Sequence, residues 1–345
     1  MSDRPIIKAP VWTWEVPLYF YVGGLAGTSA GLSRLAEASG NRVLARRASA
    51  VAFAGAVMSP ALLISDLGRP ERFLHMLRMF KVTSPMSVGS WVLAGFGAAI
   101  TPGAADHAVG GRLTGGRPAR TVAAILGLPL ASYTAALVAN TAVPAWHESR
   151  RLLPFVFVSS AAASAGGALT ALTPVADAGP ARRLAVVGAA AEIVFKETME
   201  RRLGELSDAY REGPAHRFGV GARAAMAAGA ATVAVAGGRS RAAAVAGGLL
   251  LNCGAVLTRW SVYKAGFQSA RDARHTIAPQ RERLAHRVAT AGAGQHPRMT
   301  EEPKRKPEEK KSPSGGPSTV GAPKPGEPRG FKTATAPKKK KADKP

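Results

Sequence analysis

The chain has 345 residues, of which 46% are hydrophobic, yet its mean hydropathy is only +0.02 because Ala and Gly dominate and the C-terminal end is strongly polar. Its formal net charge is +24, but the basic residues flank long apolar segments, where they orient helices and meet lipid headgroups, so the charge does not indicate nucleic-acid binding. The single cysteine, Cys253, excludes a disulfide framework and a cysteine-ligated zinc or iron–sulfur site in this chain.

Apolar segments long enough to cross a hydrocarbon core of about 30 Å recur through the first three quarters of the sequence. Lipid leaves every backbone polar group to be satisfied within its segment, and no barrel-like alternation is present, so the segments are predicted to be helices. The predicted spans are 15–36, 48–66, 86–102, 121–143, 152–173, 182–197, 218–237 and 242–258. The expected fold is an all-α integral membrane protein with about eight transmembrane helices in a bundle. The third and sixth spans are weak, so seven spans remain an alternative, and the sixth needs neighbours that shield Glu192 from lipid.

The N-terminal segment lacks the cleavage pattern of a signal peptide, so span 15–36 is predicted to be a permanent helix. Gly23, Gly27 and Gly31 recur every fourth residue and place a smooth stripe on one face of this helix, a pattern that lets helices pack closely.

Glu15 and Tyr19 are four residues apart at the start of this span and share one helical face. They present a carboxylate and a phenol just inside the membrane. Reduction of a quinone takes up two electrons and two protons, so its headgroup needs hydrogen bonds and a route for protons. We therefore predict that both residues bind a quinone and that Glu15 also transfers protons, with capping of the first helical turn as the alternative for Glu15.

Asp66 closes the second span and is followed by Arg69 and Arg72. Acidic groups at a membrane boundary are costly unless they are paired. A structural ion pair with either arginine and a role in quinone binding or proton transfer both remain open for Asp66. The segment 71–81 is amphipathic and is predicted to lie along the membrane interface.

Two further polar pairs follow along the chain. Tyr133 and Asn140 are seven residues apart on the fourth span, where either hydrogen bonds between helices or contacts to a quinone would account for them. Glu192 and Lys196 are four residues apart on the sixth span, where a buried ion pair and a role in proton transfer are both open.

Histidines are absent from all the predicted spans. A membrane cytochrome needs axial ligands inside its helix bundle, so no haem is predicted, and no glycine-rich nucleotide motif is present. The seven histidines fall in predicted loops or in the tail: His75, His107, His147, His216, His275, His286 and His296.

Residues 291–345 are rich in Pro, Lys, Gly and Glu and are predicted to be a disordered tail, which leaves residues 1–290 as the membrane domain. The tail serves either as a solvated spacer or, through 338–341, as a polybasic contact. With eight spans, both termini share one side of the bundle with the loops 67–85, 144–151 and 198–217; we call this side face A. Face A has more Lys and Arg than the other side, which predicts that both termini are cytoplasmic in a multi-pass protein of the cell membrane, although arginines that dock a partner would bias the same count.

Four segments resemble the NrfD/PsrC family of polysulfide-reductase-type membrane subunits, and the resemblance extends over residues 12–283. They are YVGGLAGTSAG (21–31), DLGRPERFLHMLRMFKVTSPMSVGSW (66–91), NTAVPAWHESRRLLPFVFVSSAAASAGG (140–167) and TRWSVYKAGFQSARDARHTIAPQR (258–281).

The resemblance implies a haem-free membrane anchor with eight helices. Such an anchor exchanges electrons between a menaquinone or ubiquinone pool and a ferredoxin-like iron–sulfur subunit, which is wired to a molybdopterin catalytic subunit. It also implies a quinone site beneath the iron–sulfur subunit, built from polar residues of the early first helix and a tyrosine of a neighbouring helix. Glu15, Tyr19 and Tyr133 hold comparable places. Docking of the iron–sulfur subunit is expected at Arg69, Arg72, Arg78, Lys81 and Trp146.

The leading hypothesis is therefore a quinone-reactive subunit of a multi-subunit oxidoreductase, without activity of its own. The complex could be of the formate dehydrogenase or the polysulfide reductase type. The alternatives are a purely structural membrane tether for a redox complex and a small-molecule or ion transporter.

Overall fold

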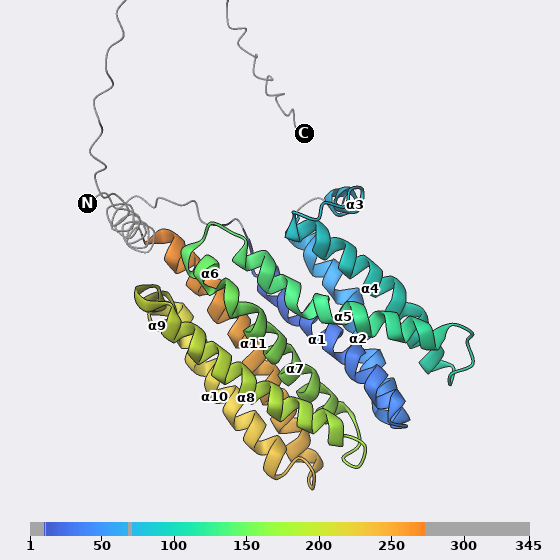
Figure 1. Ribbon diagram of the computed structural model, residues 1–345. Coiled ribbons are helices and arrows are strands. Elements are labelled where there is room, and N and C mark those ends of the chain that lie inside the picture. The colour runs from blue at the N-terminus through green and yellow to red at the C-terminus, as the bar shows by residue number, and fades with distance from the viewer. Residues whose placement is uncertain (1–9, 11, 68–70, 273–345) are drawn as a thin grey trace, which may run out of the picture. The chain divides into compact units, whose positions relative to one another are not determined.

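The computed structural model describes residues 10, 12–67 and 71–272 of the chain (Figure 1). No strand occurs in this part of the chain, which confirms the predicted all-α class. Eight of its helices have 20 residues or more: α1 (Glu15–Ala38), α2 (Arg42–Asp66), α4 (Pro85–Ala108), α5 (Gly116–Ala139), α7 (Leu153–Leu172), α8 (Gly179–Arg202), α10 (Gly213–Val235) and α11 (Arg241–Arg271). The predicted tail, 291–345, lies outside the described residues.

Short helices connect the long ones at face A. They are α3 (Glu71–Leu77), α6 (Pro144–Glu148), η1 (Ser149–Arg151), η2 (Gly204–Ser207) and α9 (Asp208–Arg211). Figure 1 shows α3, α6 and α9 at the ends of the long helices, as expected for three loops on one side of the bundle. The opposite side of the bundle is called face B. Two of its connections, between α1 and α2 and between α4 and α5, use glycines with positive φ such as Gly40 and Gly115.

Six of the long helices are apolar enough over 18 residues to cross a membrane, and α1 and α8 are the two that are not. α1 owes this to its glycines, serines and tyrosines, and α8 to its charges. α8 is nevertheless a continuous helix of 24 residues packed against α7 and α10, and its Glu192 and Lys196 are only 2% and 1% exposed. Neighbouring helices therefore shield these charges, as the prediction for the sixth span required.

The long helices form two groups of four. α1, α2, α4 and α5 pack together, and α7, α8, α10 and α11 pack together (Figure 1). The groups meet where α1 contacts α7 and α11 and where α5 contacts α7. Because α1 belongs to the first group and touches the second, its polar residues can be reached from both.

The predicted spans match these helices in order and position, but several ends differ. α11 continues to Arg271, well past the predicted end at 258, and α2 begins at Arg42 rather than at 48. A scan for apolar residues stops at the first charge, whereas a helix stops where its backbone hydrogen bonds do. Asn41 shows this for α2, because its side chain accepts a hydrogen bond from the Leu44 amide and starts the helix before three arginines.

Of the three glycines in the predicted stripe of α1, only Gly27 is required for close contact with another helix. A Cβ atom added to Gly27 would collide with the carbonyl oxygen of Gly127 on α5 and lie 3.2 Å from the Gly127 Cα atom. Gly31 has open space around it, and the nearest atom to a Cβ at Gly23 is the Ser59 hydroxyl oxygen at 3.9 Å. The α1–α5 contact is therefore backbone against backbone at Gly27 and Gly127.

A buried charge network ties α1, α4 and α5 together near face B. Arg120 donates to Glu37 and to Asp106, each at 2.6 Å, and its side chain is 5% exposed. Asp106 also accepts the Leu113 amide at 2.8 Å, which anchors the turn before α5. Because both carboxylates depend on one guanidinium, Arg120 holds three helices in register.

We expect Gly27→Ala to lower the free energy of unfolding by about 1–3 kcal/mol, because α1 and α5 must move apart. Gly31→Ala, in the same stripe, should be neutral or stabilising by up to about 1 kcal/mol, since Ala is the better helix former. The thermal unfolding midpoint of the purified protein in detergent checks both, and equal effects of the two substitutions would contradict the assigned contact.

Arg120→Met should destabilise the protein by about 3–5 kcal/mol, because it leaves the buried Asp106 and the partly buried Glu37 without their counter-charge. The exposed Arg117, one turn earlier on α5, gives a matched control: Arg117→Met should change the unfolding midpoint little. A small effect of Arg120→Met at neutral pH would show that the network does not hold these helices.

Candidate functional site

The two predicted proton-transfer carboxylates of the first group meet at face A. Thr13, just before α1, bonds to both: its hydroxyl donates to the Glu15 carboxylate and lies 2.7 Å from Asp66 Oδ1, and its amide donates to the same Asp66 oxygen at 3.3 Å. A hydroxyl has one hydrogen and cannot donate to two carboxylates at once. The single hydroxyl hydrogen can therefore serve either carboxylate, and Thr13 links the two acidic groups at one point.

An aromatic wall lies beside this cluster and joins it to the second helix group. Trp12 stacks on Trp146 of α6 with ring centroids 5.2 Å apart, and its carbonyl oxygen accepts the Tyr263 hydroxyl of α11 at 2.5 Å. The Trp146 indole donates to the Val262 carbonyl at 2.7 Å. The segment that carries Thr13 is thereby fixed against α6 and α11.

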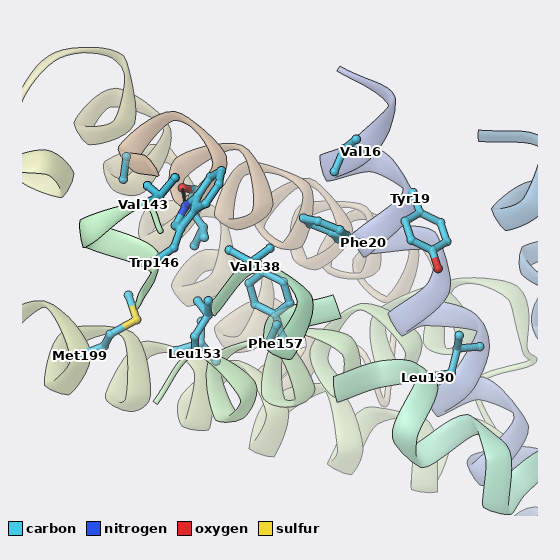
Figure 2. Packing of buried hydrophobic residues seen from close by; sticks show 14 of the residues in the cluster. Val16, Tyr19, Phe20, Leu130, Val138, Val143, Trp146, Leu153, Phe157 and Met199 are labelled. Carbon is cyan, nitrogen blue, oxygen red and sulfur yellow. Dashed lines mark hydrogen bonds between the residues drawn. The ribbon is translucent and has the colours of Figure 1, made fainter. Parts of the chain in front are cut away.

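Tyr19 lies one turn below Glu15 and is 2% exposed. Its hydroxyl oxygen is buried and has no hydrogen-bond partner among the described residues. Figure 2 shows that Tyr19 and Phe20 leave α1 in different directions, with Phe20 toward Phe157 of α7, where the ring centroids are 6.0 Å apart. A buried donor without an acceptor is costly, and a carbonyl oxygen is the group that would satisfy it.

Tyr133 and Asn140, the other predicted quinone contacts, are on α5. Tyr133 is half-buried, and its ring covers Gly89 of α4 so closely that no side chain fits there. Asn140 ends α5 at face A and is exposed. The structure thus joins Glu15 with Asp66 directly and leaves Tyr133 and Asn140 on a different helix pair of the first group.

The predicted docking residues divide into two kinds. Arg72, Arg78 and Lys81 are exposed at face A around α3, while Arg69 lies outside the described residues. The predicted alternative of an Asp66–Arg72 ion pair is not formed: Arg72 donates to the Leu67 carbonyl at 3.4 Å instead. Trp146 is 1% exposed, which is inconsistent with the predicted direct contact to a partner, and it packs inside the protein instead.

Glu192 and Lys196 do not form the ion pair that their spacing allows. The Glu192 carboxylate accepts the Thr258 hydroxyl, and Lys196 donates to Ser261 at 3.4 Å, so each side chain reaches across to α11 separately. A spacing of four residues places Glu192 and Lys196 on one face of α8, but their hydrogen-bond partners are Thr258 and Ser261 on the facing helix α11.

Arg259 is the main polar residue that the sequence analysis missed. It is 1% exposed on α11, donates to the Phe157 carbonyl of α7 at 2.9 Å, and stacks 4.0 Å above the Phe157 ring. It also interacts electrostatically with Glu192. Its Nε and Nη1 atoms have no acceptor within the described chain. The predicted eighth span ended at 258 and so placed Arg259 outside the membrane; a helix continued by one more turn would have revealed it.

Two histidines lie closer to the spans than predicted. His107 is in the last turn of α4 and His216 is in the first turn of α10, because both helices extend beyond the predicted spans. They are at opposite faces of the bundle, since α4 ends at face B and α10 begins at face A. Neither is near the middle of a helix, where a haem ligand would be expected.

The architecture is that of a multi-pass membrane protein with its polar groups gathered inside two helix groups and at one face. A family model described as polysulfide reductase, of the NrfD type, matches residues 5–271. The chain therefore belongs to the NrfD-type polysulfide reductase family, whose members are membrane subunits of oxidoreductase complexes and partner with iron–sulfur and molybdopterin subunits. A search of curated proteins gives no significant match.

We expect Arg259→Met to destabilise the protein by about 3–5 kcal/mol, because the buried Glu192 loses a nearby positive charge. Arg259→Lys should be intermediate, since it keeps the charge but loses the planar contact with Phe157. Arg271→Met, at the exposed end of the same helix, is the control and should leave the thermal unfolding midpoint unchanged. Equal midpoints for all three variants would show that Arg259 is structurally dispensable.

Proposed function

We propose that this chain is the quinone-reactive, haem-free membrane subunit of a molybdopterin oxidoreductase. In this role it exchanges electrons between a menaquinone or ubiquinone pool and a ferredoxin-like iron–sulfur subunit. One observation carries the proposal: two carboxylates joined through Thr13 lie at face A, one helical turn from a buried tyrosine hydroxyl that has no acceptor. These are the proton-holding group and the hydrogen-bond donor that a quinone headgroup requires.

The residues present fit a quinone headgroup. Tyr19 supplies a donor for a carbonyl oxygen, Tyr133 is a second phenol on the neighbouring α5, and the half-buried Trp12 supplies apolar surface for a ring. The quinone contributes the two-electron, two-proton chemistry when it is bound. Glu15 and Asp66 hold and release protons at their carboxylate oxygens, and the exposed Thr13 keeps that cluster in contact with water at face A.

Partner docking at face A follows from the same arrangement. Arg72, Arg78 and Lys81 are exposed around α3, next to the end of α2 that carries Asp66. An iron–sulfur subunit bound there would bring its iron–sulfur clusters near the proposed quinone site, and its acidic groups would pair with these basic side chains. The complex has its terminal substrate at the molybdopterin subunit, so formate dehydrogenase and polysulfide reductase chemistry are both compatible with this membrane subunit.

A second proton path is proposed through the other helix group. Glu200 and Arg223 form an ion pair at 3.0 Å near face A, and below them Lys196, Ser261, Glu192 and Thr258 continue between α8 and α11. Glu192 and Lys196 are the proposed proton carriers of this path. The same charges do not favour the transporter alternative, because the first group has no matching midplane charges among its described residues and its helices continue through Pro60, Pro102 and Pro129.

Tyr19→Phe should lower quinone-coupled turnover about tenfold, the effect of one lost hydrogen bond in the reacting complex. Glu15→Gln should lower it about a hundredfold, because a proton carrier is removed. Tyr21→Phe is the matched control on α1: its hydroxyl bonds to Asn252 at 2.7 Å, away from the cluster, and quinone turnover should persist.

The measurement compares quinone-coupled with dye-coupled activity of the purified complex, since a dye reports the soluble subunits alone. Dye-coupled activity should be unchanged in all three variants. Normal quinone turnover in both Tyr19→Phe and Glu15→Gln would overturn the proposal and favour a purely structural tether.

A further inference from the structure

A pocket of about 460 Å³ lies at face A between the start of α7 and the end of α8. It is separate from the Thr13 cluster. Its walls include three arginines, Arg150, Arg151 and Arg202, together with Glu148 and Ser149, and its apolar lining comes from Leu152, Met199 and Leu203.

The charges of the pocket are only partly compensated. Arg150 lies 3.6 Å from the Glu148 carboxylate and donates to the His147 carbonyl at 3.1 Å, so it is already occupied. Arg151 and Arg202 are exposed, and neither forms an ion pair within the part of the chain that the structure describes. Their neighbour Arg201 differs, because it pairs with Glu197 at 2.9 Å. The pocket thus has two uncompensated guanidinium groups around an apolar floor.

Below the pocket, the outer surfaces of α7 and α8 are apolar and exposed. Phe155 and Val158 on α7 are 54% and 42% exposed, and Val187 and Val194 on α8 are 66% and 61% exposed. Phe155 also contacts Phe195 with ring centroids 5.3 Å apart, which joins the two surfaces into one strip just beneath the arginines. A ligand that occupies both the pocket and the strip must have an anionic head and long apolar tails.

We propose that this pocket binds the headgroup of an anionic phospholipid, with its acyl chains along the α7–α8 strip. Guanidinium groups match phosphate oxygens in charge and geometry, and basic pockets between membrane helices at the headgroup level are suited to anionic lipids. An acidic segment of a protein partner would satisfy the arginines but would make no use of the adjoining strip. The lipid satisfies both, and it does so independently of quinone chemistry.

The test uses the purified full-length protein, delipidated in detergent, with phosphatidylglycerol or cardiolipin added in mixed micelles. Thermal unfolding and native mass spectrometry report lipid binding. The unfolding midpoint should rise with either lipid and not with phosphatidylcholine. Arg151→Gln/Arg202→Gln should weaken the apparent affinity about 30-fold, the effect of two lost basic contacts at a lipid surface.

The control is Arg201→Gln/Arg217→Gln, which removes the same charge from face A at two exposed arginines that do not line the pocket. Its lipid affinity should stay within about twofold of the wild type, within the range expected of exposed charges. Equal losses in both double variants would overturn the proposal, because they would indicate general attraction to a basic face.

Inorganic phosphate distinguishes a lipid site from a site for the free anion. Millimolar phosphate should neither raise the unfolding midpoint as the lipid does nor displace bound lipid. A full phosphate response would assign the site to the free anion. Unchanged lipid affinity together with lost association of the iron–sulfur subunit would assign the arginines to a protein partner; either result would overturn the lipid assignment.

Discussion

The interior of a membrane contains no water to hydrogen-bond a polar group, and a helix gains no hydrophobic free energy by exchanging lipid contacts for contacts with another helix. This constraint shapes the whole bundle. Helices can associate only by close packing or by internal polar contacts. The packing is achieved by small residues: Gly27 against Gly127 joins α1 to α5, and Gly229 against Gly247 joins α10 to α11. Each helix group is thus closed by backbone contacts that any larger side chain would prevent.

Buried polar side chains differ in how completely their hydrogen bonds are satisfied. Arg120 near face B has both carboxylate partners, so that network is complete and holds helices together. Arg259 in the second group has one carbonyl acceptor and a ring, with two nitrogen atoms left over. Tyr19 near face A has no acceptor at all. A polar group with unsatisfied hydrogen bonds is costly in a membrane interior, so a bound molecule or a proton that completes those hydrogen bonds is stabilised there.

The sequence predicted the helices well because transmembrane segments carry a strong, local signal in their length and composition. It also placed Glu15 and Asp66 at one face, since each lies at the end of a span. Contacts between helices were harder to predict from the sequence. The Glu37–Arg120–Asp106 network links three helices, and no spacing along the chain encodes it. The Glu192–Lys196 pair was permitted by its spacing, but Thr258 and Ser261 on α11 provided better partners.

The wall beside the Thr13 cluster shows why the two helix groups are best regarded as one functional unit. Trp12 precedes α1 of the first group, yet it stacks on Trp146 and is bonded by Tyr263 of the second. Gly266 of α11 leaves the space that the Trp146 indole fills. A shift of α11, on which Arg259 and Thr258 also lie, would therefore be transmitted through Trp146 and Trp12 to Thr13. The proposed proton path in the second group and the proposed quinone site in the first are thus joined through these contacts at face A.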